Sequence, residues 1–141
     1  MISQIYWLVP HHVLYWKMSG CISGIEICEM SRFITTQVSQ LASRKVHIII
    51  DSAGVTQLDY TNHEAREAFH RLANQVWMGK VIAIIHSYQI QAHLNALSGG
   101  FGLNWENVAS VQAAIRSLKK VDNLLQDVPI LQPSSLIVRP E

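Results

Sequence analysis

Short apolar runs and helically spaced apolar residues alternate along this chain. Two of the runs are continuous and β-branched, VHIII before Asp51 and VIAII before His86, and such runs are typical of parallel strands buried on both faces. Three more runs are rich in Ile, Val, Tyr or Trp, and only the tripeptide PHH separates the first two, which predicts an N-terminal β-hairpin. The expected strands cover residues 2–9, 13–19, 46–51, 81–85 and 103–108.

Apolar residues three and four positions apart predict helices between these strands. Ser23 with Glu26, and Thr61 with Glu64, have the spacing of capping boxes, which satisfy the free amides at a helix start. Gly79 is expected to end the second helix in a left-handed conformation. The expected helices cover residues 24–42, 62–77 and 89–97, and a last one, capped by Ser110, carries Val111, Ala114, Leu118 and Val121 on one side.

This order of elements predicts an α/β fold, because parallel strands need crossover connections. We expect a mixed sheet of about five strands, with an N-terminal β-hairpin, and about four helices. Residues 1–122 are expected to form a single domain. Residues 123–141 contain three prolines and several apolar residues without a helical period, so we expect an extended tail that docks on the domain or on a second subunit.

The composition of the chain limits the classes of partner that it is expected to bind. The chain has 141 residues, of which 49% are hydrophobic and 15% are charged, so part of its apolar surface is expected to be covered by a partner. Its net charge of +1 does not suit a nucleic-acid binder. It has neither an apolar run of the ~18 residues that span a membrane nor a signal-peptide pattern. We therefore expect a cytoplasmic protein, with Cys21 and Cys28 as free thiols.

Both alternating faces of the predicted hairpin are apolar, with Tyr6 and Leu8 on one face and Ile5 and Trp7 on the other. An exposed edge hairpin of this kind would aggregate unless it were covered. We therefore expect a homodimer through the hairpin, and a cavity for a hydrophobic ligand is the alternative.

Two kinds of chemistry can be read from the polar residues, and neither is favoured. His63, Glu67 and His70 share a helix face and could converge on a cation, but a closed zinc site needs a further ligand, so no metal or other cofactor is expected. Asp51, His86 and Thr61 could form an acid, base and hydroxyl set. No GxSxG nucleophile elbow accompanies them, however, and an enzyme is not expected.

A strand that ends at Asp51, followed by Asp59 just before a hydroxyl at a helix start, resembles the STAS domain family of anti-sigma-factor antagonists. The resemblance covers roughly residues 13–121. The family carries a pattern near Asp-Ser-Ser-Gly where this chain has Asp59-Tyr60-Thr61-Asn62, so Asp59 matches the acid and Thr61 falls on the hydroxyl that an anti-sigma kinase phosphorylates. Tyr60 and Asn62 depart from the pattern, as in a divergent group of small stand-alone bacterial STAS-like proteins.

The resemblance implies a non-enzymatic module for protein interaction and signalling, with a kinase or an anti-sigma-like protein as partner. The segment 55–63 is then the partner-binding loop, and Thr61 is the candidate phosphorylation site. The loop residues expected to contact a partner are Val55, Asp59, Tyr60, Thr61, Asn62 and His63.

The alternative hypothesis is a domain that binds a small apolar ligand or a lipid in a cavity between sheet and helices. The residues expected to line that pocket are Trp16, Phe33, Asp51, Phe69, Trp77 and His86.

Overall fold

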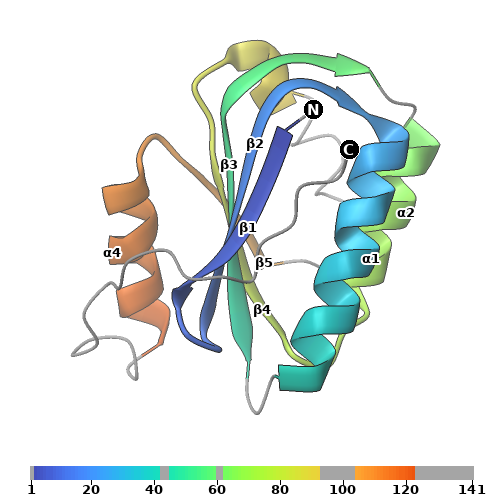
Figure 1. Ribbon diagram of the computed structural model, residues 1–141. Coiled ribbons are helices and arrows are strands. Elements are labelled where there is room, and N and C mark those ends of the chain that lie inside the picture. Colours follow the sequence, from blue (N-terminus) through green and yellow to red (C-terminus); the bar gives the residue numbers. More distant parts are fainter. Residues whose placement is uncertain (1, 42–44, 60–61, 93–103, 123–141) are drawn as a thin grey trace.

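A five-stranded mixed sheet with helices on both faces is the framework of the protein (Figure 1). The computed structural model describes residues 2–41, 45–59, 62–92 and 104–122. The strands, in their order across the sheet, are β1 (Ile2–Val9), β2 (Val13–Ser23), β3 (Val46–Asp59), β4 (Met78–Ile84) and β5 (Asn104–Val108). The helices are α1 (Gly24–Leu41), α2 (Asn62–Ala73) and α4 (Val111–Val121), and residues 88–92 are also helical.

Strand pairing confirms the predicted fold class. β1 and β2 form an antiparallel hairpin, whereas β2, β3, β4 and β5 run parallel to one another. Parallel neighbours need crossover connections, and α1 and α2 supply two of them on one face of the sheet, while α4 covers the other face (Figure 1).

β3 lies in the middle of the sheet and contributes to both hydrophobic cores. Ile48 and Ile50 belong to the core under α1 and α2, and Ile49 belongs to the core under α4. Since alternate side chains of a strand point to opposite faces, a continuous apolar run is what a central strand requires. The prediction that this run is buried on both faces is confirmed.

The hairpin is covered within a single chain. Ile5 and Trp7 are buried in the core under α1 and α2, whereas Leu8 and Val9 are buried in the core under α4. The exposed apolar face that led us to expect a homodimer is therefore not present among the described side chains of the hairpin. A homodimer stays a prediction that needs another interface.

Two of the predicted helix starts are confirmed by their caps. The Ser23 hydroxyl accepts a hydrogen bond from the Glu26 amide (3.3 Å) and donates one to the Glu26 carboxylate (2.8 Å). At the start of α4, the Ser110 hydroxyl accepts from the Ala113 amide (3.1 Å). The box predicted at Thr61 cannot be compared in the same way, because Thr61 lies outside the described residues.

The predicted ends of β2 and β3 were wrong. We expected the strands to end at Ser19 and Asp51, but the two continue in parallel until Ser23 pairs with Asp59. The pairing shifts register twice on the way, and Gly20 has a left-handed φ of 79° at the second shift. Gly54 lies in β3, beyond the predicted end of the strand, where a Cβ atom would stand 2.9 Å from the Cβ of Ser19. Close strand contact therefore explains this glycine.

Gly79 also has a different role from the predicted one. α2 ends at Ala73 instead of residue 77, Val76 is 89% exposed, and Gly79 lies within β4 without a positive φ. Glycine is needed at position 79 because the His47 ring lies beside it, where the ring Nδ1 accepts a hydrogen bond from the Lys80 amide (2.9 Å). A Cβ atom on Gly79 would lie 2.6 Å from that nitrogen.

We expect Gly79→Ala to lower the free energy of unfolding by about 1–3 kcal/mol, the usual cost of overpacking, as measured by urea denaturation. The His47→Ala background supplies the control. Removal of the ring relieves the contact, so the second substitution should cost clearly less there. Equal costs in the two backgrounds would show that the His47 ring is not the obstacle.

Candidate partner-binding site

The sheet splits at its carboxyl-terminal edge. β3 pairs with β4 only as far as Asp51 opposite Ile84, but it pairs with β2 as far as Asp59. At the split, the buried Ser52 hydroxyl donates to the Ile84 carbonyl (2.7 Å), and the chain after β4 stays with β5. The ends of β2 and β3 bend together toward the start of α1 and α2 (Figure 1), as expected where a strand contains bulges.

A groove of about 510 Å³ lies at this split, between the end of β3 and the segment that follows β4. Open α/β sheets usually bind their ligands beyond the carboxyl ends of the strands, so the groove is the natural place for a functional site. None of the described residues that line it carries a formal charge. They are Val55, Thr56, Gln57, Leu58, Ser87, Gln89, Ile90 and Ala92.

The predicted partner-binding loop is largely a strand. Residues 55–59 belong to β3, where Val55 and Leu58 pack against the core and Thr56, Gln57 and Asp59 are exposed. The expectation of a loop was wrong because pairing with β2 holds this polar stretch extended. His63 is exposed in the first turn of α2, and Asn62 begins that helix, but Tyr60 and Thr61 lie outside the described residues. In the sequence, Asp59 and His63 thus flank Thr61, the candidate phosphorylation site.

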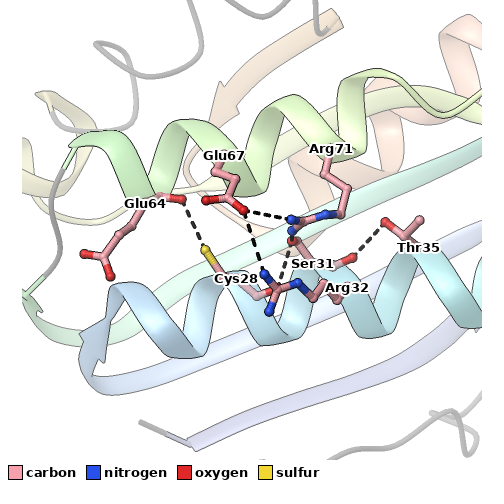
Figure 2. Close-up of polar contacts among 7 residues, drawn as sticks. All are labelled: Cys28, Ser31, Arg32, Thr35, Glu64, Glu67 and Arg71. Atoms are coloured by element: carbon pink, nitrogen blue, oxygen red, sulfur yellow. Dashed lines mark hydrogen bonds and ion pairs between the residues drawn. The ribbon is translucent and has the colours of Figure 1, made fainter.

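Hydrogen bonds in the seam between α1 and α2 fix the position of α2 (Figure 2). The buried Ser31 hydroxyl donates to the Cys28 carbonyl (3.0 Å) and accepts from Arg71 (2.7 Å), while the Cys28 thiol donates to the Glu64 carbonyl (3.4 Å). Burial, with the nearby Glu67 carboxylate, raises the pKa of Cys28, so the thiol stays protonated and can donate. Through the Glu64 carbonyl, the first turn of α2 is therefore held against α1.

Two of the three residues considered for a metal site have other partners. Glu67 accepts from Arg71 (3.1 Å) and lies 3.8 Å from Arg32, while His70 shares a hydrogen bond with Asn74 (3.0 Å). In the part of the chain that the structure describes, no three His, Cys, Asp or Glu side chains gather as metal ligands would.

Two of the six residues predicted to line a ligand pocket border the same described cavity. Trp16 and Phe69 border an apolar hollow of about 20 Å³ beneath the groove, which leaves room for roughly one water molecule. Phe33 packs nearby at the rim of the same core. Trp77 lies at the other end of the sheet, where its indole donates to Ser39 (2.9 Å), and His86 is exposed.

Asp51, the remaining pocket candidate, faces α4 instead. It is 8% exposed and accepts hydrogen bonds from the Tyr15 hydroxyl and from the Ala53 amide (3.0 Å). The Tyr6 ring stacks on Tyr15 with 5.1 Å between ring centroids. Burial raises the pKa of both tyrosines, and the Asp51 carboxylate raises each of them further. A hydrolase that used Asp51 and His86 would need the two side chains in contact. No described contact joins them, and Asp51 is engaged by Tyr15 instead.

Sequence reasoning missed the residues that hold this site together. Tyr15 lies in an apolar strand of the predicted hairpin, and Ser31 and Arg71 lie within predicted helices. Each acquires its role from a partner 36 to 40 positions away in the chain. The available signal was a polar atom at a position that the apolar pattern predicts to be buried, because such atoms need a hydrogen-bond partner.

Solved structures with a similar fold include two of direct interest. The anti-sigma factor antagonist SpoIIAA, in its unphosphorylated form, aligns with a TM-score of 0.55 and 14% identity over 83% of this chain and 97% of its own. An uncharacterized protein of the DUF3478 family from Shewanella loihica, with a SpoIIAA-like fold, aligns with a TM-score of 0.58 and 13% identity over 82% and 91% of the two chains. By sequence, no family model and no curated protein matches.

The chain therefore has the SpoIIAA-like α/β fold, and the STAS-like domain predicted from its sequence is confirmed at the level of the fold. At these identities the likeness concerns the fold alone. None of the described helices is long and apolar enough to cross a membrane.

Proposed function

We propose that this protein is a non-enzymatic regulatory module that binds a protein partner with the end of β3 and the start of α2. The observation that carries the proposal is the likeness to SpoIIAA, an anti-sigma factor antagonist, over nearly the whole of that chain. The proposed surface is polar and exposed at Thr56, Gln57, Asp59 and His63. A rigid scaffold with an exposed polar end suits recognition by a partner.

Phosphorylation of Thr61 would act as the switch of this module. α2 begins at the next residue, and the free amides and the dipole at a helix start favour an added phosphate. A phosphate would also place a charge of about −2 on the surface next to Asp59. A partner that fits the unmodified surface would then be repelled, and one with an arginine cluster would be attracted.

Thr61→Asp is expected to weaken binding of the partner by about tenfold or more, because it adds a negative charge at the contact surface. The partner is first cross-linked to the protein in its own source, then purified and titrated against variants by calorimetry. Thr36→Asp is the matched control, because Thr36 is an exposed threonine in α1 away from the proposed surface. Mass spectrometry of the protein from the same source shows whether Thr61 carries phosphate.

Two outcomes would count against this function. Equal binding by the two aspartate variants, together with an unmodified Thr61, would remove the switch. A chain that forms no cross-link to any protein and instead releases a lipid-sized molecule would favour the apolar-ligand hypothesis over the interaction module.

A further inference from the structure

The split of the sheet leaves one edge of β3 open, in the sense that no described strand lies beside it. From Gly54 to Asp59 this strand pairs with β2 on one side, while β4 has already diverged on the other. No other described strand pairs with the open side over these residues. Unpaired main-chain amides and carbonyls at a strand edge are a template for another strand.

The groove lies along this open edge and has the form that an extended peptide needs. Residues 55–58 form one wall and are already extended, so they span about 13 Å at roughly 3.3 Å per residue. The opposite wall includes the helical residues Gln89 and Ile90. A helix has no strand edge, so an added strand would pair with the main chain of β3 and not with the helical wall.

The lining also indicates which side chains would fit. Val55, Leu58 and Ile90 line both the groove and the small apolar hollow beneath it, so an apolar side chain of an occupant would meet apolar surface there. The described lining contains no charged residue. A charged side chain in the groove would lose water without gaining a counter-charge, which is unfavourable.

We infer that the protein partner adds an extended, uncharged segment of about four residues to the open edge of β3. The inference rests on the proposed function and specifies how the partner would bind. Main-chain hydrogen bonds to residues 55–58 would hold the segment, and one apolar side chain over Val55, Leu58 and Ile90 would select it. Strand addition would use both the extended end of β3 and the uncharged groove beside it.

Selection of random linear peptides displayed on phage, with the full chain as bait, tests this inference without knowledge of the partner. We expect enrichment of uncharged sequences with a β-branched or aromatic anchor, and slower amide hydrogen exchange at residues 55–58 when a selected peptide is bound. Gln89→Trp, which fills the groove from its helical wall, should weaken peptide binding by about tenfold or more. The control is Gln112→Trp, at an exposed position of α4, which should leave binding unchanged; thermal unfolding checks that both variants fold.

Several results would overturn strand addition. They are failure to enrich any peptide, peptide binding that Gln89→Trp leaves intact, and protection confined to other strands. Dissociation of a wild-type dimer by Gln89→Trp would make a second copy the occupant, and peptide binding only after removal of residues 123–141 would make it this chain's own C-terminal segment. Either result overturns the partner segment as the occupant.

The two proposals fail in different ways. A cross-linked partner that binds Gln89→Trp as tightly as it binds wild type overturns strand addition and leaves the interaction module standing. If no partner is found, the proposed function fails, whatever peptides the groove selects.

Discussion

Trp16→Ala is expected to lower the free energy of unfolding by about 3–5 kcal/mol, as for other large aromatic side chains removed from a core. Trp16 is 1% exposed and lies on β2 between Ile5 of β1 and Ile50 of β3. The loss is large against the ~5–15 kcal/mol by which domains are stable. Urea denaturation followed by circular dichroism measures it.

Trp105→Ala is the matched control for this prediction, because Trp105 is only half-buried and contacts Phe69 edge to face at 5.7 Å. It should cost clearly less than Trp16→Ala. A loss at Trp16 no larger than that at Trp105 would show that the Trp16 ring is not tightly packed.

The same substitution examines the apolar-ligand hypothesis. Trp16 borders the hollow of about 20 Å³, so its removal would enlarge an apolar space, and enlarged apolar cavities can take up small apolar molecules. We expect a fluorescent fatty acid to bind neither wild type nor the Trp105→Ala control. If any of the three proteins binds it, that protein should be the Trp16→Ala variant. Stoichiometric binding to wild type would favour the ligand-carrier hypothesis instead.

The sequence was enough to predict the body of the sheet and the helices that cover it. The Val46–Ile50 run is buried throughout, and burial on both faces needs only apolar residues at consecutive positions, whichever strands lie beside them. The caps at Ser23 and Ser110 are equally local, because a cap residue and the amide it accepts from are three positions apart.

The ends of β2, β3 and β4 depend on contacts that a local pattern does not contain. Residues 54–59 have little intrinsic strand preference, and it is pairing with residues 19–23 that keeps them extended, as tertiary context often does in sheets. Gly54 and Gly79 look like turn residues in the sequence. Glycine is needed at both positions because Ser19 and His47, which are distant in the chain, approach them closely.

The form of the candidate site could not be predicted from the sequence. The groove between β3 and residues 87–92 arises because β4 diverges from β3. Divergence of two strands is a property of the assembled sheet. Asp51 illustrates the same limit, since its place after an apolar run is visible in the sequence and its partner Tyr15 is not.

The Tyr15–Asp51 pair leads to the second large prediction, a steep loss of stability in alkaline solution. In the unfolded chain a tyrosine loses its proton near pH 10.0, its ordinary pKa, whereas burial raises the pKa of Tyr15 and Tyr6 in the folded protein. Above about pH 10 the unfolded state therefore binds fewer protons than the folded state, so stability falls as pH rises. Tyr15 contributes up to about 1.4 kcal/mol per pH unit until its folded pKa is reached, and Tyr6, which is closer to solvent, contributes less.

Tyr15→Phe separates the two parts of this effect. Near neutral pH it should cost about 1.5–3 kcal/mol, because the buried Asp51 carboxylate loses its hydroxyl donor and keeps the Ala53 amide. Above pH 10 the decline in stability should be shallower than in wild type, because the Tyr15 hydroxyl no longer contributes to it. Urea denaturation at a series of pH values measures both parts, and Tyr88→Phe, at a position 91% exposed, is the control that should change neither. If wild type and Tyr15→Phe lost stability at the same rate above pH 10, the Tyr15 hydroxyl would not be held protonated in the fold.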